Sequence, residues 1–151
     1  MVFSFLLSLS IVGLLLSAAY YDLRNKTIPN KLTYGMVVAG LLFALVAGGR
    51  AGLAGSLIGL AVGGGIFFFF WLIKAMGGAD VKLMAGVGAF LGWPSILDAL
   101  FFTALCGGIM AILFLIWKRK PKGEKPEVPL RKQTLPYGVA IAAGTILSLI
   151  L

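Results

Sequence analysis

Hydrophobic residues follow one another in six long runs, and short stretches between the runs hold most of the polar and charged residues. The runs cover residues 2–20, 32–47, 53–73, 83–93, 96–117 and 135–151. They are continuous and do not alternate between apolar and polar positions, as the strands of a membrane barrel must. A helix satisfies its own backbone groups inside a bilayer and needs ~20 residues to cross it. The pattern therefore predicts an all-α integral membrane protein with six transmembrane helices, the fourth of them short.

The composition supports the membrane class and limits the chemistry of the chain. Hydrophobic residues make up 60% of the sequence and charged residues 12%, whereas soluble domains hold ~25% charged residues. The mean hydropathy is +1.04. Cys106 is the only cysteine and there is no histidine, which excludes an internal disulfide and a cysteine–histidine zinc site. We expect a single membrane-embedded domain over residues 1–151, with no metal and no cofactor.

The basic residues determine the predicted orientation. Twelve of the 13 lysines and arginines fall on alternate connections, and only Arg50 falls on the other side. Because basic residues favour the cytoplasmic side, we expect that side to be the cytoplasm and both termini to lie outside. Seven of these residues precede the last run, where we expect a flexible basic loop at about 118–134. Topology thus accounts for the net charge of +8, and we expect a lipid bilayer but no nucleic acid as a partner.

Two of the five acidic residues stand where a predicted span meets the cytoplasm. Asp22 ends the first run and Asp80 precedes the fourth, so the six-span topology brings them to one face, whereas Asp98 falls near the other. A carboxylate at the edge of the hydrocarbon is costly and marks a functional candidate. Two close carboxyls can share a proton, so that one activates water and the other polarises a carbonyl. Because a helix start favours negative charge, we predict that Asp80 is the base and Asp22 the acid.

Glycines surround Asp80. Gly77 and Gly78 place little side chain beside the carboxylate, so an extended substrate could approach it closely. Gly86 and Gly88 are expected to leave room in a groove between the spans. The alternative for Gly77 and Gly78 is a simple interruption between two helices.

The stretches around the two aspartates read YYDLRNKTIPNKLT and MGGADVKLMAGVGAFLGW, and a later stretch reads LPYGVAIAAG. In this order they resemble the type IV prepilin peptidase family, membrane aspartyl proteases of the GxGD kind. The resemblance implies that Asp22 and Asp80 are the catalytic aspartates, and that Pro29, Asn30 and Lys82 support them, as do the glycines before Asp80. It implies removal of the short leader of prepilin-like proteins at the cytoplasmic side of a bacterial inner membrane.

The chain departs from the family pattern in two ways. Ala79 stands where GxGD has its second glycine. Longer members carry an N-terminal domain with paired cysteines and methylate the new pilin N-terminus, whereas this sequence has Cys106 alone. The resemblance therefore implies the short, peptidase-only form found with tight-adherence (Flp) pili, without methyltransferase activity.

Two other functions stay open on the sequence. A small ion- or proton-coupled transporter would use Asp22 and Asp80 as its ion-binding groups. A non-catalytic scaffold subunit would leave the two acids as a coincidence. Their expected place at one face, away from the bilayer centre, favours the peptidase. The sequence predicts neither the oligomeric state nor the particular prepilin.

Overall fold

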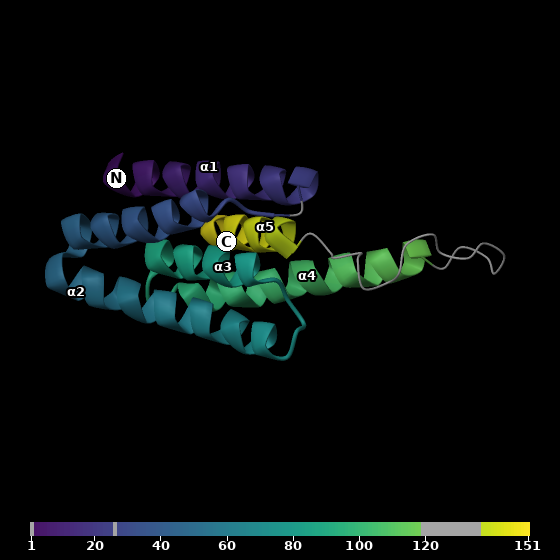
Figure 1. The fold of residues 1–151 in the computed structure, drawn as a ribbon. Coiled ribbons are helices and arrows are strands. Elements are labelled where there is room, and N and C mark those ends of the chain that lie inside the picture. Colours follow the sequence, from purple (N-terminus) through teal and green to yellow (C-terminus); the bar gives the residue numbers. More distant parts are fainter. Residues whose placement is uncertain (1, 26, 119–136) are drawn as a thin grey trace.

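The computed structural model describes residues 2–25, 27–118 and 137–151, and its regular structure within them is helical (Figure 1). The helices are α1 (Val2–Asn25), α2 (Asn30–Leu72), α3 (Gly78–Leu91), α4 (Ile96–Lys118) and α5 (Tyr137–Ile150). The all-α class predicted from the sequence is confirmed. The loop predicted at about 118–134 lies, from residue 119 onward, outside the described residues.

α2 consists of two helical halves joined by a reversal at Gly49. Gly49 has a φ of 57° and a ψ of −141°, a conformation that residues with a Cβ rarely adopt. The halves, 30–48 and 50–72, run in opposite directions along the bundle (Figure 1). A straight helix of 43 residues would be roughly 65 Å long, about twice the thickness of a bilayer core. The reversal therefore turns one long apolar segment into the second and third predicted elements.

With α2 divided at Gly49, the helices match the six apolar runs one for one, and the fourth element is short, as expected. By length and composition, α2 and α4 are the helices among the described residues that could cross a membrane. α3 and α5 have 14 residues each, fewer than the ~20 that a full span needs. The positions of the helical elements are confirmed, and six membrane crossings stay a prediction.

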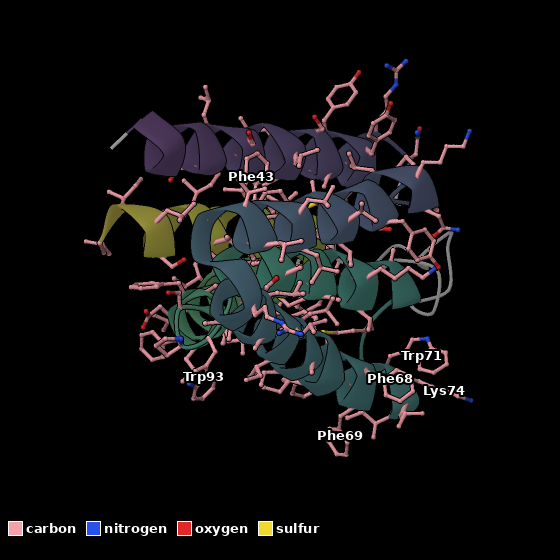
Figure 2. All side chains as sticks on the ribbon, turned by 90° about the vertical axis from the view of Figure 1, so that its left-hand side faces the viewer. Phe43, Phe68, Phe69, Trp71, Lys74 and Trp93 are labelled. Carbon is pink, nitrogen blue, oxygen red and sulfur yellow. The ribbon has the colours of Figure 1, made fainter. Side chains whose placement is uncertain are left out.

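The two ends of the bundle differ in charge. Figures 1 and 2 together show the N-terminus, the end of α5 and the Gly49 reversal toward one end, and the end of α1, both ends of α2 and the starts of α3 and α5 toward the other. Arg24, Lys31, Lys74 and Lys82 belong to this second end, which we call the basic end. Arg50 follows the reversal and belongs to the first. The described basic residues are thus distributed as the sequence predicted.

The outer surface is apolar along the length of the bundle. Large hydrophobic side chains are exposed on α1, α2, α4 and α5, and those on α4 include Ile109, Ile112, Leu113, Leu115 and Ile116. Trp71 and Trp93 are also exposed, and Figure 2 shows them at opposite ends. An extended apolar belt with aromatic residues near its two edges is typical of a surface in contact with lipid. The fold presents the surface of an integral membrane protein.

α3 is largely buried between the two halves of α2. The Gly59 carbonyl oxygen lies so close to Gly88 that no side chain fits between them. Gly40, in the other half of α2, approaches the backbone of Ala89 in the same way. Small residues that allow such contact are a main source of helix packing in membranes. These contacts fix α3, and with it the start of the helix that carries Asp80.

The expectation that Gly86 and Gly88 leave room in a substrate groove is wrong. An added Cβ on Gly86 would lie 3.0 Å from the Cβ of Met36, and Gly88 touches the backbone of Gly59. Both glycines serve helix packing, because α2 encloses α3 at these positions. Any space for a substrate must lie elsewhere in the bundle.

Candidate active site

Asp22 lies in the last turn of α1, at the basic end, and is only 8% exposed. Its Oδ2 atom accepts a hydrogen bond of 2.8 Å from the backbone N–H of Gly138, at the start of α5. The first N–H groups of a helix have no partner within that helix, so α5 offers free donors to this carboxylate. The bond joins α1 to α5 across 116 positions of sequence.

Asp80 lies in the first turn of α3 and is also 8% exposed. Gly77 caps this helix in an extended conformation, and its carbonyl accepts the Asp80 N–H at 3.2 Å. An added Cβ on Gly77 would lie 3.4 Å from Asp80 Oδ2, and one on Gly78 would lie 3.5 Å from Trp71 Nε1. A Cβ at either position would make an ordinary contact, with the carboxyl at Gly77 and with the indole of Trp71 at Gly78.

The two carboxyls lie at the same end of the bundle, within electrostatic reach of each other. The negative charge of Asp22 contributes to raising the pKa of Asp80. Asp98 lies in the first turn of α4, at the end that holds the termini. The fold thus brings together the two aspartates that the run pattern assigned to one face, and it keeps the third apart.

Both carboxyls lie beyond the predicted spans, residues 2–20 and 83–93. Their surroundings give the two carboxyls different proton affinities. Burial raises the pKa of Asp80 to about 6, and the charge of Asp22 also raises it, against a lowering by the backbone at Gly77. Burial raises the pKa of Asp22 as well, but backbone hydrogen bonds from Gly138 and Val139 lower it. Because N–H donors stabilise the Asp22 carboxylate, a proton shared by the pair favours Asp80.

This order is opposite to the one predicted from helix dipoles, which made Asp80 the base and Asp22 the acid. Asp80 does stand at a helix start, where the dipole favours charge. Burial outweighs that effect, because removing a carboxylate from water disfavours its ionised form more strongly. In addition, the start of another helix, α5, faces Asp22 and favours its charge.

A second contact joins the start of α2 to the start of α3. Lys82 Nζ donates a hydrogen bond of 2.9 Å to Asn30 Oδ1 and lies 5.4 Å from the centre of the Tyr34 ring. Asn30 is the first residue of α2, and Pro29 stands at the cap before it. The supporting residues identified beside each aspartate therefore meet each other, 52 positions apart. Their contact sets the relative position of two helix starts at the basic end.

Gly138 is a residue of the site that the reasoning from sequence did not identify. A Cβ on Gly138 would lie 2.7 Å from Asp22 Oδ2 and 3.0 Å from Asp22 Cβ. Only a residue without a side chain lets the backbone of α5 reach the carboxylate at this distance. The available signal was the glycine in the stretch LPYGVAIAAG, whose partner the sequence does not reveal.

The chemistry that these groups offer is proton transfer. Within the described parts of the chain, no group of three or more His, Cys, Asp or Glu side chains could hold a metal ion. Cys106 is a free, half-buried thiol on α4. At the basic end, burial raises the pKa of both carboxyls, that of Asp80 to about 6, and backbone hydrogen bonds oppose the rise at Asp22. Such a pair can accept a proton from water and donate one to a carbonyl oxygen.

A family model described as the type IV leader peptidase family matches residues 9–112. The match covers most of the chain and includes Asp22, Asp80 and the supporting residues beside them. It ends before α5, so the residues that bond to the Asp22 carboxylate lie outside it.

Three curated relatives share the description prepilin leader peptidase/N-methyltransferase. The protein of Aeromonas hydrophila is 32% identical over 149 residues, which cover 93% of this chain and 48% of that protein. The protein of Bacillus subtilis (strain 168) is 30% identical over 145 residues, 91% of this chain and 52% of its own length. The protein of Myxococcus xanthus (strain DK1622) is 33% identical over 116 residues, which cover 72% of this chain and 34% of that protein. The chain spans about half the length of the first two. No solved structure gives a significant match.

Proposed function

Because the chain belongs to the type IV leader peptidase family, we propose that it is an aspartyl endopeptidase that removes the short leader of prepilin-like membrane proteins. The single observation that carries the proposal is the pair of buried carboxyls at one end of the bundle, with unequal proton affinities. An aspartate that only ended a helix at the membrane surface would need neither burial nor a second carboxyl beside it.

In the proposed reaction, ionised Asp22 acts as the base and protonated Asp80 as the acid. Asp22 takes a proton from a water molecule, whose oxygen bonds to the scissile carbonyl carbon, while Asp80 gives its proton to the carbonyl oxygen. The tetrahedral intermediate then collapses: the hydroxyl proton returns to Asp80, the carbon–nitrogen bond breaks, and Asp22 gives its proton to the leaving amine. The Gly138 N–H keeps Asp22 oriented and ionised at the start of each cycle.

The supporting residues act by positioning the carboxyls. Gly77 and Gly78 leave free the space that a Cβ would occupy beside the Asp80 carboxyl and beside Trp71, and a peptide backbone could use this space to approach Asp80. Pro29 and Asn30 start α2, and the hydrogen bond from Lys82 to Asn30 holds that start against α3.

We place the cleavage on the cytoplasmic side of a bacterial inner membrane. Both carboxyls lie at the basic end, which the distribution of positive charge assigns to the cytoplasm. In this orientation the chain crosses the membrane six times as one domain, with both termini outside. A leader in the cytoplasm and an apolar segment in the bilayer would put the scissile bond at the depth of the carboxyls.

The relatives' description joins a peptidase to an N-methyltransferase, and we assign only the hydrolysis to these residues. The carboxyl pair supplies the two proton transfers that peptide hydrolysis requires, one from water and one to the carbonyl oxygen. We expect the peptidase-only form associated with Flp-type pili, without a cofactor. An assay for methyl transfer to the cleaved product tests this part independently of cleavage.

Replacement of each aspartate by asparagine tests the catalytic assignment. Asp22→Asn and Asp80→Asn keep the size of the side chain but remove its proton chemistry. We expect each change to reduce cleavage of a prepilin-like substrate in membranes by roughly 10²–10⁴-fold, with the protein still inserted. The matched control is Asp98→Asn, which we expect to cut like the wild type because Asp98 lies at the opposite end.

Wild-type cleavage by either site variant would remove that aspartate from the mechanism. A wild-type protein that cuts no prepilin but conducts protons or ions, with flux lost on Asp22→Asn and Asp80→Asn, would favour the transporter. Absence of both activities would favour the scaffold.

A further inference from the structure

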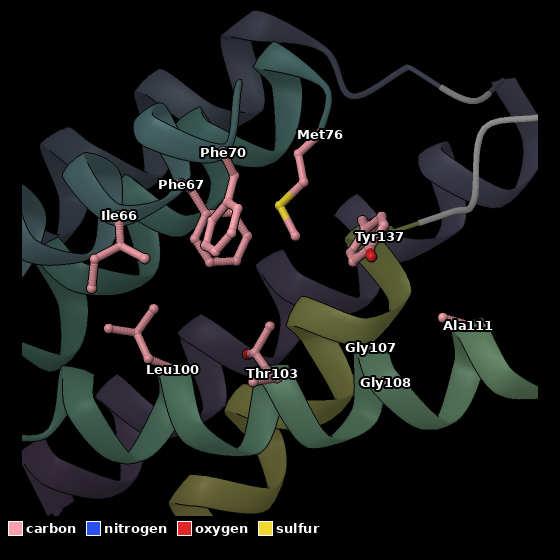
Figure 3. Close-up of a pocket in the computed structure, with 11 residues that line it drawn as sticks. Ile66, Phe67, Phe70, Met76, Leu100, Thr103, Gly107, Gly108, Ala111 and Tyr137 are labelled. Carbon is pink, nitrogen blue, oxygen red and sulfur yellow. The ribbon is translucent and has the colours of Figure 1, made fainter. Parts of the chain in front are cut away.

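An apolar cavity of about 370 Å³ lies between the second half of α2 and α4. Ile66, Phe67 and Phe70 line it from α2, and Leu100 lines it from α4 (Figure 3). α2 packs mainly on α3, and α4 packs mainly on α5, which leaves this space between the two pairs. The proposed reaction makes no use of it.

One end of the cavity adjoins the active site. Figure 3 shows Met76 and Tyr137 together at this end. Met76 directly precedes Gly77, the cap of the helix that carries one carboxyl. Tyr137 directly precedes Gly138, the donor to the other carboxyl. The cavity therefore begins at the two segments that hold the catalytic pair and extends from there between apolar helices.

Small residues form much of the α4 side of the cavity. They are Ala104, Gly107, Gly108 and Ala111. A Cβ added to Gly108 would meet no atom within 4 Å, so the space in front of it is open. Small residues on a membrane helix allow another apolar segment to approach its backbone closely.

Thr103 also lines the cavity, but it does not offer a hydroxyl to an occupant. The residue is 4% exposed, and its Oγ1 atom is itself enclosed by the protein. An occupant of the cavity therefore meets mainly apolar and small side chains. Such a lining is suited to a segment with apolar side chains.

We propose that this cavity binds the apolar segment of the substrate directly after the scissile bond, an inference that rests on the proposed function. A membrane protein cut at the bilayer surface presents apolar residues on the membrane side of the cut. The cavity extends from Met76 and Tyr137, beside the starts of α3 and α5, toward Ile66 and Leu100, away from the basic end (Figure 3). A helix is about 10–12 Å wide with its side chains, so the cavity holds a few side chains of the segment and leaves the rest of its helix against α2 and α4.

Filling the cavity tests the inference. Gly108→Leu places a side chain in the open space of the cavity, and Gly65→Leu places the same side chain on exposed α2, where an added Cβ also meets nothing within 4 Å. The substrate is a fusion of a short basic leader, a glycine junction and an apolar helix. We expect Gly108→Leu to raise KM for this fusion about tenfold or more, the effect of one blocked apolar contact. Gly65→Leu should leave KM unchanged.

A short peptide that carries the leader and junction without the apolar helix separates binding from chemistry. We expect the wild type and both variants, Gly108→Leu and Gly65→Leu, to cut this peptide at equal rates, because the peptide does not reach the cavity. A loss of cleavage by Gly108→Leu on this peptide would show damage to the site itself and would overturn the inference.

Crosslinking identifies the occupant. Cys106→Ser removes the native thiol and Asp80→Asn prevents cutting, and a new thiol is then introduced as Ala104→Cys or, for the control, as Gly65→Cys. Single cysteines are placed one at a time along the apolar helix of the fusion. We expect disulfides between the Ala104→Cys thiol and positions in the first turns after the junction, and none with the Gly65→Cys thiol.

Equal KM values for Gly108→Leu and Gly65→Leu, or equal crosslinking of the two introduced thiols, would overturn the inference. Labelling of the Ala104→Cys thiol by a lipid-linked reagent, with no protection by the fusion, would assign the cavity to lipid and overturn it as well. If the wild type does not cut the fusion, the proposed function fails, and the crosslinking pattern still decides whether the cavity binds an apolar peptide.

Discussion

The two aspartates are held in different ways by two sides of the bundle. Asp80 is carried by α3, which α2 encloses through backbone contacts such as the one between Gly59 and Gly88. Asp22 ends α1, and a hydrogen bond from Gly138 holds its carboxylate directly. One side fixes a helix by packing, and the other fixes the charged group itself.

This difference separates the roles of two chemically identical side chains. Packing buries the Asp80 carboxyl, and the one backbone hydrogen bond that favours its charge, at Gly77, does not offset the burial, so its pKa rises. Hydrogen bonds from N–H groups favour the ionised form of Asp22 and oppose the effect of burial. A site that needs an acid and a base can therefore use two aspartates, provided that their supports differ.

Among changes to the supports of the two aspartates, the largest effect is expected from Gly138→Ala, which breaks the support of Asp22. The new Cβ would lie 2.7 Å from Asp22 Oδ2, so the carboxylate or the start of α5 must move. A displacement of about 1 Å in a reacting group costs roughly 100-fold in rate, and we expect kcat for leader cleavage to fall by that factor. The measurement is kcat in membranes that contain equal amounts of inserted protein.

Gly35→Ala is the matched control, because an added Cβ at Gly35 meets nothing within 4 Å. It should cut like the wild type. A Gly138→Ala enzyme with wild-type kcat would show that the contact with α5 does not position Asp22.

The limits of prediction from sequence follow the same division. The bilayer requires long apolar helices, so the run pattern identified all six helical elements, including the two that meet at Gly49. Apolar residues that face lipid and apolar residues that face another helix look alike in sequence. Leu83 is fully buried in α3 and Ile109 is 58% exposed on α4, yet each stands in an apolar run.

The same ambiguity explains why the sequence did not reveal the backbone partners of the two aspartates. Asp22 and Asp80 could be singled out because a carboxylate at a span edge is rare and costly. The backbone groups that face them could not be predicted, because Gly138 is 116 positions from Asp22 and no local pattern encodes that contact. The pKa shifts favour the opposite assignment of acid and base for this reason, since the assignment depends on burial and on the donors around each carboxyl.

The packed side is tested by Gly88→Ala, the second-largest expected effect. An added methyl group would collide with the backbone at Gly59, and overpacking of a close contact costs typically about 1–3 kcal/mol. We expect the free energy of unfolding to fall by that amount, while kcat per folded molecule stays within a few-fold. Unfolding in detergent measures the first quantity, and Gly65→Ala, which meets open space, is the control. Unchanged stability would mean that α3 is not fixed by this contact.

The smallest effect, and the one that sharpens the contrast most, is the pH dependence of cleavage. The pKa of Asp80 is raised from 3.8 to about 6, so Asp80 is protonated below about pH 6 and ionised above it. As the acid it should be lost as pH rises, and kcat should fall about tenfold for each pH unit above 6. At lower pH, protonation of Asp22 removes the base. Burial raises the pKa of Asp22, so this acidic limb should lie above 3.8.

Gly138→Ala then decides which carboxyl belongs to which limb. The bond from Gly138 lowers the pKa of Asp22, so its loss should raise that pKa and move the acidic limb to higher pH. The alkaline limb, which belongs to Asp80, should stay in place, because Gly138 does not bond to that carboxyl. Residual kcat measured across the pH range in detergent micelles gives both limbs. Movement of the alkaline limb alone would make Asp22 the acid, and the two kinds of support would then have their roles exchanged.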